Sequence, residues 1–368
     1  MKKRIIIAGG GTGGHFYPAL SMAMAFKEKG WQVAFAVKKG DICLPALAEN
    51  ELPSIEIDTV ALPRSFNPLK HLKFLFKLIS SLIYSLRVIK DFSPNAVLGT
   101  GSYVAFPIVL AAKIKKIPSF IHESNTVMGI SNRLSGIFAD KVFLGLPLRQ
   151  NPFPSKSLLT GTPLRKIFFE EITKQDARKK LGLPEDTFIF LVFGGSQGSE
   201  NINEAFYKIL LDLSIEKKKL NFIQISGKDK FQDMKEKYDK AALIKDNLLF
   251  PYYENMPILY AAADAVISRS GSGTICELLH YKKPAILVPL KIAAGDHQTF
   301  NAMELARHGC ALILKDEESL QSGFKKAILK LLTTENLSAM RKAYERIDIP
   351  QGIEPQRKIL ETIDKGAL

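Results

Sequence analysis

Short apolar runs alternate with longer amphipathic segments along all 368 residues of the chain. Strands buried on both faces of a parallel sheet read as continuous apolar runs, and the helices between them are amphipathic. In the first half, the runs predict strands at 4–8, 32–37, 55–59, 96–99, 119–122 and 141–144. In the second half, they predict strands at 188–193, 221–226, 248–251, 265–268, 285–288 and 311–314. The pattern therefore predicts an α/β protein with two doubly wound, Rossmann-like sheets.

The length of the chain suits two domains, and its 46% hydrophobic content supplies a core for each. A boundary is predicted near 161–163, after a loosely patterned stretch at 151–157. The final segment, 351–365, has the pattern of a helix that crosses back to the first domain. We therefore expect one domain at 1–160 together with 349–368, and a second at 161–348.

A glycine-rich turn follows the first predicted strand. Gly9, Gly11 and Gly14 have the spacing G-x-G-x-x-G, at which backbone N–H groups and a helix N-terminus bind phosphate. A NAD site would also place an acidic residue about 20 positions further on to hold a ribose. Lys38 and Lys39 stand there instead. This disfavours NAD but leaves a 2′-phosphate, and thus an NADP-linked oxidoreductase, as an alternative.

His15 directly follows these glycines, so its imidazole is expected to reach whatever the turn binds. Histidine is the most common general base near neutral pH, which makes His15 a candidate catalytic residue. The alternative is a histidine that only packs or caps at the helix start.

Polar clusters also follow two other strands of the first half. Gly101, Ser102 and Tyr103 come after the strand at 96–99, and His122 and Glu123 end the strand at 119–122. Because open α/β sheets bind ligands at the carboxyl ends of their strands, we expect both clusters to converge with His15. The alternatives are an ordinary glycine turn and a mutually satisfied buried His–Glu pair.

The second half repeats the strand, turn and helix pattern. A glycine-rich turn at 194–199 follows one strand, and a Ser/Gly turn at 270–274 leads into a helix whose free N–H groups suit an anion. Glu277, near the start of that helix, suits the two hydroxyls of a ribose or simply complements the helix dipole. The polar stretch 296–301, expected between a strand and the helix at 302–307, suits sugar hydroxyls or a helix cap. Arg165 is a candidate phosphate ligand or a plain surface arginine.

The charge of the chain indicates anionic partners. Lys and Arg number 51 against 37 Asp and Glu, which leaves a formal charge of +14. The basic residues are spread out rather than grouped with stacking aromatics, so binding of nucleic acid is disfavoured although it remains an alternative. Three cysteines far apart in the sequence argue against a disulfide framework and for a reducing compartment. No apolar run approaches the roughly 20 residues that cross a bilayer.

One segment, 67–92, combines lysines with large apolar residues at helical spacing. A basic amphipathic helix of this kind binds the interface of an anionic membrane. The alternative is a helix whose apolar face covers the sheet and whose lysines face water. The residues expected to form a membrane patch are Lys70, Lys73, Phe74, Leu75, Phe76 and Lys77.

Six motifs, in order along the chain, together resemble one enzyme family. They are Gly-Gly-Thr-Gly-Gly-His at 10–15, His-Glu-x-Asn at 122–125, Gly-Thr-Pro-x-Arg at 161–165, Gly-Gly-Ser-Gln-Gly at 194–198, Arg-Ser-Gly at 269–271 with Glu277, and His-Gln-x-x-Asn-Ala at 297–302. The family comprises the two-domain GT-B glycosyltransferases that transfer N-acetylglucosamine from UDP-N-acetylglucosamine to lipid I, forming lipid II for peptidoglycan. The resemblance implies two Rossmann-like domains that face each other across a cleft.

The resemblance also implies roles for individual residues. The implied donor ligands are Thr12, Gly13, Gly14, Asn125, Arg165, Ser196, Tyr253, Ser270, Gly271, Thr274, Glu277, His297 and Gln298. The implied acceptor ligands are Gly11, Thr12, Gly13, Gly101, Ser102 and Tyr103. His15 is the preferred base, with Glu123 and His122 as alternatives. The implied reaction is inverting and uses neither cofactor nor metal, since helix N–H groups and Arg165 meet the charge of the leaving UDP.

The implied location is the cytoplasmic face of the cell membrane, as a peripheral protein, with further cell-wall synthesis proteins as partners. Ser124, Ser102 and Ser272-Gly273 replace the Gln, Gly and Ala-Leu that are usual in the family. These departures lie at the substrate sites, so a UDP-sugar-dependent diacylglycerol glycosyltransferase is an alternative.

Overall fold

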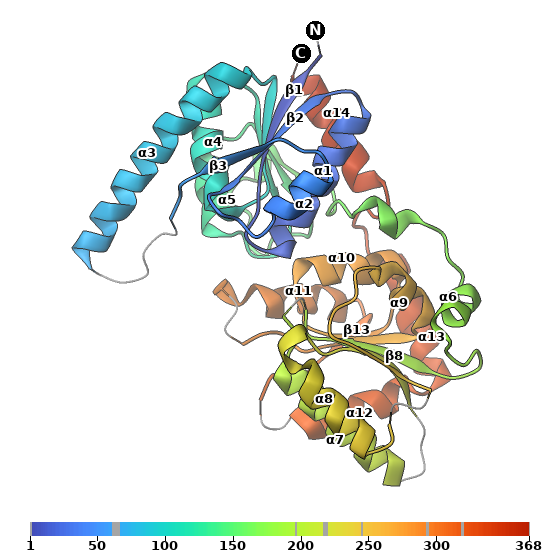
Figure 1. Cartoon of the computed structure of the whole chain (residues 1–368). Helices are drawn as coiled ribbons and strands as arrows, with labels where there is room; N and C mark the ends of the chain where they lie inside the picture. Colours follow the sequence, from blue (N-terminus) through green and yellow to red (C-terminus); the bar gives the residue numbers. More distant parts are fainter. Residues whose placement is uncertain are drawn as a thin grey trace. The chain divides into compact units, whose positions relative to one another are not determined.

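The computed structural model of the chain describes residues 2–60, 67–195, 197–215, 220–243, 246–291, 294–317 and 320–367. It divides into two compact units, Met1–Arg165 with Ile349–Leu368 and Lys166–Asp348 (Figure 1). Residues 161–165, expected at the start of the second domain, thus belong to the first unit.

The first unit contains a parallel sheet of seven strands in the order β3-β2-β1-β4-β5-β6-β7. The strands are β1 Arg4–Ala8, β2 Gln32–Lys38, β3 Ser54–Ile57, β4 Ala96–Gly99, β5 Ser119–Glu123, β6 Lys141–Leu144 and β7 Ser157–Leu159. Six of them lie within two residues of their predicted ends. The seventh, β7, falls in the stretch that the sequence left without a strand, and it extends the sheet by pairing Ser157 with Val142.

Helices cover both faces of this sheet (Figure 1). They are α1 Gly13–Glu28, α2 Leu44–Glu49, α3 Pro68–Phe92, α4 Ser102–Ile114, α5 Ile130–Phe138 and α14 Glu354–Gly366, with a short 3-10 turn at Pro154–Lys156. The C-terminal α14 returns to this unit, where Ile359 and Ile363 are fully buried in its core. The Gln356 amide also donates to the backbone oxygen of Leu164 at 2.8 Å. These contacts fix the 161–165 segment against the first unit.

The second unit contains a parallel sheet of six strands in the order β10-β9-β8-β11-β12-β13. Its strands are β8 Ile189–Phe193, β9 Asn221–Ile225, β10 Leu248–Phe250, β11 Ala265–Ser268, β12 Ala285–Leu287 and β13 Ala311–Ile313. Its helices are α6 Lys174–Leu181, α7 Glu200–Ile215, α8 Phe231–Lys240, α9 Met256–Ala262, α10 Ser272–Tyr281, α11 His297–Ala306, α12 Leu320–Leu331 and α13 Thr334–Ala343. Short 3-10 turns lie at Lys166–Phe169, Lys228–Lys230, Ala294–Asp296 and Tyr344–Arg346.

The strand order of both sheets reverses direction at one place. In the first unit this switch point lies between β1 and β4, and in the second between β8 and β11. Loops that leave neighbouring strands on either side of a switch point diverge, which opens a crevice at the carboxyl edge of the sheet. All four loops at these two switch points carry glycine-rich motifs, at 9–14, 99–101, 194–198 and 269–273.

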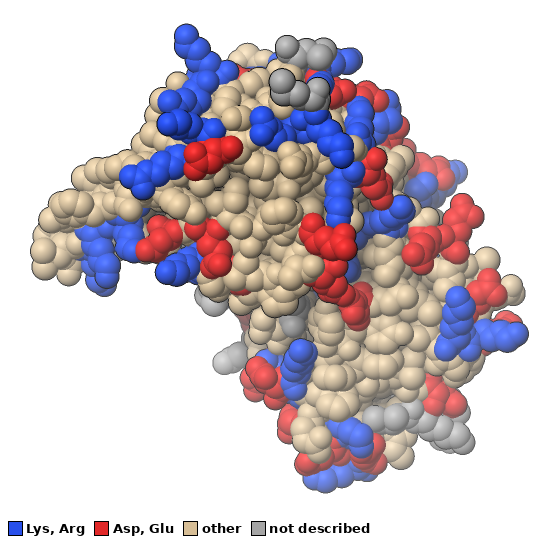
Figure 2. Space-filling model, turned by 45° about the horizontal axis from the view of Figure 1, so that its top comes forward, with Lys and Arg blue, Asp and Glu red and all other residues tan. Residues whose placement is uncertain are grey.

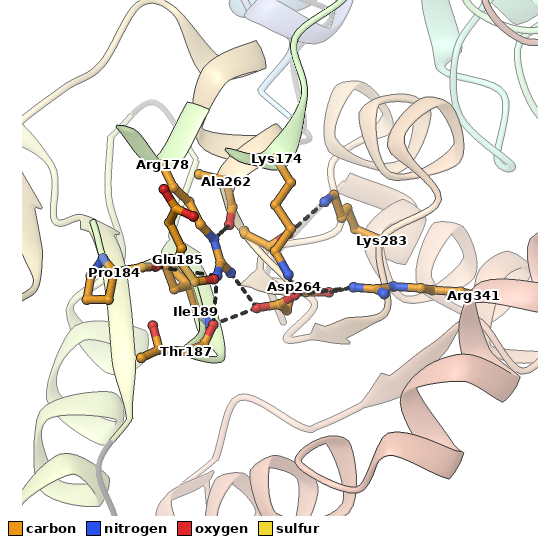
Figure 3. A network of polar contacts seen from close by, with 11 residues as sticks. Lys174, Arg178, Pro184, Glu185, Thr187, Ile189, Ala262, Asp264, Lys283 and Arg341 are labelled. Atoms are coloured by element: carbon orange, nitrogen blue, oxygen red, sulfur yellow. Dashed lines mark hydrogen bonds and ion pairs between the residues drawn. The ribbon is translucent and has the colours of Figure 1, made fainter. Parts of the chain in front are cut away.

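A buried charge network lies at the opposite, amino-terminal edge of the second sheet (Figure 3). The Asp264 carboxylate accepts hydrogen bonds from Lys174 Nζ at 2.5 Å, Arg178 Nη2 at 2.7 Å and the Ile189 N–H at 2.9 Å. Arg341 Nη2 lies 3.4 Å from the same carboxylate. Burial lowers the pKa of the nearby Lys283 to about 7. The network joins α6, β8, β11 and α13, and we assign it to stability.

Candidate active site

The first glycine turn carries the chain from β1 into α1. Thr12 is the N-cap of α1 with an extended backbone, and the N–H groups of Gly13 and Gly14 have no acceptor among the residues that the structure describes. These two N–H groups and the helix dipole suit a phosphate. The N–H of Gly11, in contrast, donates to the Asp41 carboxylate at 3.0 Å. The N–H groups of Gly13 and Gly14 are therefore better placed to bind an anion than the N–H group of Gly11.

Thr100 holds His15 by two hydrogen bonds. His15 Nδ1 lies 2.9 Å from the backbone oxygen of Thr100, and the Thr100 hydroxyl donates to the backbone oxygen of His15 at 2.8 Å. A carbonyl oxygen only accepts, so Nδ1 carries the proton and Nε2 keeps its lone pair. Nε2 has no hydrogen-bond partner among the described residues. His15 is thus set up as a base.

Gly101 provides the space for the His15 ring. A Cβ atom at Gly101 would lie 2.5 Å from His15 Nδ1, and Gly101 has φ +108°, which favours glycine. Its neighbour Ser102 has φ +66° and begins α4, and Tyr103 is partly exposed. The structure thus brings the 99–103 cluster against the first glycine turn, as the sequence predicts for neighbouring strands β1 and β4.

His122 and Glu123 are buried and fully engaged. Glu123 accepts four hydrogen bonds at 2.9–3.0 Å, two from Asn125 and one each from the N–H of Gly129 and the amide of Asn132. His122 Nε2 lies 3.1 Å from the Gly161 oxygen, and its Nδ1 lies 3.3 Å from the Ser124 hydroxyl. Both side chains hold loops in place, which leaves His15 as the candidate base with an available lone pair.

Acid should destabilise the protein through His122. Burial lowers the pKa of His122 to about 4, from an ordinary value of 6.5. Between these values the unfolded chain binds a proton that the folded protein does not, so the free energy of unfolding should fall by up to about 3 kcal/mol as pH drops through this window. Urea unfolding at pH 7 and pH 4.5 measures this change. In His122→Asn the drop should shrink, whereas an equal drop would assign it to other groups.

Arg165 lies over an aromatic ring of α1. Its guanidinium carbon is 4.6 Å from the centroid of Tyr17, two residues beyond His15. This cation–π contact fixes the side chain of Arg165 beside the first glycine turn. The structure therefore brings together Arg165, His15, Gly13, Gly14 and Gly101 within the first unit.

In the second unit, Arg269 organises the carboxyl edge of the sheet. Its Nη2 donates to the Ser199 hydroxyl at 2.7 Å, and its Nη1 donates to the Val288 oxygen at 3.1 Å and lies 2.8 Å from Asp316 Oδ2. Arg269 thereby ties the turn at 194–199 to the ends of β11 and β12. Ser196 itself lies outside the described residues.

The turn at 270–274 leads into α10, with Gly271 as its N-cap. A Cβ atom at Gly271 or Gly273 would meet no atom within 4 Å, so the space beside this helix start is open. The Ser270 hydroxyl donates to the Gln298 oxygen at 2.8 Å, and Gln298 Oε1 accepts from the Leu290 N–H at 3.0 Å. His297 and Gln298 form the first turn of α11, rather than the loop that the sequence predicted.

Glu277 lies in the second turn of α10 and is half-buried. Its Oε2 accepts a hydrogen bond from the Tyr260 hydroxyl at 2.7 Å. Burial raises the pKa of Tyr260 well above its usual value, so this hydroxyl stays a donor. Tyr260 therefore fixes the orientation of the carboxylate. Tyr253 follows β10, with its ring 4.6 Å from that of Phe250.

Two Rossmann-like units, each with glycine-rich turns and helix starts at its switch point, form the GT-B architecture. Residues 5–144 match the glycosyltransferase family 28 N-terminal domain, and residues 189–354 match the glycosyltransferase family 28 C-terminal domain. The chain belongs to glycosyltransferase family 28.

The chain is similar to known transferases and to a solved structure over most of its length. A UDP-N-acetylglucosamine-N-acetylmuramyl-(pentapeptide) pyrophosphoryl-undecaprenol N-acetylglucosamine transferase of Elusimicrobium minutum is 35% identical over 98% of this chain and 99% of its own. The transferase of the same name from Carboxydothermus hydrogenoformans is 34% identical over 89% of each chain. The crystal structure of Acinetobacter baumannii MurG superposes with a TM-score of 0.79 at 26% identity, covering 99% of this chain and 100% of that one.

Proposed function

We propose that the protein transfers N-acetylglucosamine from UDP-N-acetylglucosamine to the 4-hydroxyl of the muramyl sugar of lipid I, forming lipid II for peptidoglycan synthesis. The names of the relatives support this donor and acceptor. The observation that carries the chemistry is the His15 imidazole, with its proton fixed on Nδ1 by Thr100 and its Nε2 lone pair available.

The first unit binds the acceptor. Its pyrophosphate lies on the turn at 11–14 and on Gly101 and Ser102, beside Tyr103. His15 Nε2 takes the proton of the muramyl 4-hydroxyl as that oxygen bonds to the anomeric carbon. The bond from this carbon to the UDP oxygen breaks in the same step, so the attack comes from the opposite face and inverts the configuration.

The second unit binds the donor. The diphosphate lies near Ser196 and at the start of α10, where Ser270, Gly271 and Thr274 stand. Glu277 accepts hydrogen bonds from the ribose hydroxyls, Tyr253 borders the uracil, and His297 and Gln298 bind the sugar. From the first unit, Thr12, Gly13, Gly14, Asn125 and Arg165 complete the donor contacts.

The reaction needs no metal in this account, because helix N–H groups and the Arg165 guanidinium meet the negative charge that develops on UDP. Fluorescence titration with NADPH separates this function from the NADP-linked alternative, which requires tight nicotinamide binding. Transfer assays with diacylglycerol in place of lipid I test the other alternative, a UDP-sugar-dependent diacylglycerol glycosyltransferase. We expect no product with diacylglycerol, and a faster reaction with it than with lipid I would favour the diacylglycerol enzyme.

We also propose that α3 docks the protein on the cytoplasmic face of the cell membrane. None of the described helices has both the length and the apolar composition to span a bilayer. In α3, however, large apolar side chains face solvent, with Leu69 74% and Phe76 66% exposed, and Leu75 is exposed as well. Figure 1 shows α3 on the outside of its unit, and Figure 2 shows a mostly uncharged surface there, with basic side chains and some acidic ones beside it. Such a surface suits an anionic membrane interface.

Charge reversal on α3 tests this docking. Lys70 and Lys73 are exposed, while Lys77 forms an ion pair with Asp58 and is left unchanged. Each exposed lysine contributes about 1 kcal/mol near an anionic surface, so Lys70→Glu with Lys73→Glu should weaken vesicle binding by more than about tenfold. Flotation with phosphatidylglycerol vesicles measures the binding. The matched control is Lys179→Glu with Lys180→Glu on α6, and equal binding by both variants would exclude α3 as the docking surface.

A further inference from the structure

The short helix α5 presents an apolar stripe to solvent. Ile130, Leu134 and Ile137 are 53%, 39% and 58% exposed, at a spacing that puts them on one face of the helix. The residues that α5 buries are Asn132, Ser135 and Gly136. Phe138, at the end of the helix, packs against the core. The other three large apolar side chains point outward, whereas an ordinary surface helix turns such side chains toward the core. An outward stripe of this kind indicates a binding surface.

The stripe begins at the loop that we assign to the acceptor pyrophosphate. The Ser131 hydroxyl donates to the Ser102 oxygen at 2.5 Å, which joins the first turn of α5 to the first turn of α4. Gly101, next to Ser102, packs against the ring of His15. Ile130, next to Ser131 in the sequence, therefore lies at the end of α5 that contacts the acceptor loop. Leu134 and Ile137 lie further along the helix.

Charged groups accompany the stripe. Arg133 is exposed between Ile130 and Leu134 in sequence. At the other end of α5, Lys156 Nζ donates to the backbone oxygens of Ile137 and Ala139, at 3.2 and 2.8 Å. The loop assigned to phosphate, the arginine and the apolar stripe follow one another along this surface. A ligand with an anionic head and an apolar tail would bind to them in the same order.

We propose that the α5 stripe binds the first isoprene units of the polyprenyl chain of the acceptor. This inference rests on the proposed function, since it takes the pyrophosphate to lie at 101–102. The tail that leaves a pyrophosphate is apolar from its first carbon atoms, so it is stabilised by an apolar surface that starts beside the phosphate. Because α4 packs against both α5 and α3, the chain continues from α5 across the same helical layer toward the membrane-docking α3.

The test compares two acceptors in detergent micelles. One is lipid I with its full polyprenyl chain, and the other is an analogue with a short, water-soluble alkyl chain. In the variant Ile130→Ser, Leu134→Ser, Ile137→Ser, the KM for the full-length acceptor should rise at least about tenfold, as expected on losing the burial of a few methylene groups. The KM values for the short acceptor and for UDP-N-acetylglucosamine should stay unchanged. Substitution of the two isoleucines by leucine should preserve the wild-type KM.

The outcomes separate the inference from the function on which it rests. If the wild-type protein uses neither acceptor, the proposed function fails. If it uses both and the serine variant has an unchanged KM for the long acceptor, the α5 proposal fails alone. An equal rise for both acceptors, or a loss confined to vesicle binding, would also overturn it, since the stripe would then serve the fold or the membrane. The control is Ile353→Ser, a substitution of another exposed isoleucine at the start of α14, which should leave both KM values unchanged in micelles.

Discussion

Alanine in place of His15 is expected to lower kcat for sugar transfer by about 10²–10⁴-fold, the contribution of a well-positioned general base. The reason is that Thr100 fixes the proton on Nδ1 and leaves Nε2 as the acceptor. Binding of UDP-N-acetylglucosamine, measured by calorimetry, should persist, because the proposed donor site places most of its contacts in the second unit. The expected signature is therefore a loss in kcat with an intact donor affinity.

Two further variants test whether the loss is specific to His15 and to the position of its ring. Gly101→Ala places a Cβ atom where the His15 ring lies and should also reduce kcat strongly, although it removes no titrating group. His71→Ala, on the exposed start of α3, is the matched control and should leave kcat unchanged. A His15→Ala enzyme that retains activity within about tenfold of the wild type would remove His15 from the base role.

Alanine in place of Asp264 should cost about 3–5 kcal/mol of stability in the second unit, because it leaves the buried guanidinium of Arg178 without its counter-charge. Asp264 is almost fully buried and bonds to Lys174 and Arg178, and Arg341 lies beside it (Figure 3). Arg178 is itself buried, so its charge has no route to water once the carboxylate is gone. Hydrogen exchange of the β8 and β11 amides reports the opening of this unit separately from the first.

The matched comparison for this variant is Lys174→Ala. The Lys174 side chain is 45% exposed, so its pair with Asp264 is screened by solvent and its removal should cost no more than about 1 kcal/mol. The account requires a clear difference between the two variants. Equal exchange rates in both would mean that the network contributes little to the stability of the unit.

Most of the fold could be predicted because buried parallel strands are continuous apolar runs. The predicted strands at 4–8 and 188–193 are each preceded by a polar residue and followed by glycine, which sets their ends within two residues of those of β1 and β8. The strand β7 escaped this reasoning because only three residues pair, and two of these are no more than half-buried leucines. The start of α11 was placed too late because the residues from His297 to Asn301 are mostly polar and look like a loop, although they already form the first turns of the helix.

The candidate site could be located in sequence, but its internal contacts could not. Motifs after strands mark the carboxyl edge, and strand order then brings 9–15 next to 99–103. Which hydrogen bonds form depends on distances across neighbouring strands, which the sequence does not give. The contacts of Thr100 with His15, of Asp41 with Gly11 and of Tyr260 with Glu277 were therefore not predicted. The four hydrogen bonds that Glu123 accepts could not be predicted either, since two of the donors lie on α5 or at its start.

The central claim is a single sugar transfer between a nucleotide-bound donor and a lipid-linked acceptor. The most direct measurement follows radiolabel from UDP-N-acetylglucosamine into the lipid extract, with and without lipid I, in the presence of a chelator. We expect labelled lipid only when lipid I is present, at a rate that the chelator leaves unchanged. Label in the extract without lipid I would contradict the assigned acceptor. A reaction that stops with the chelator and resumes with a divalent cation would contradict the metal-independent mechanism.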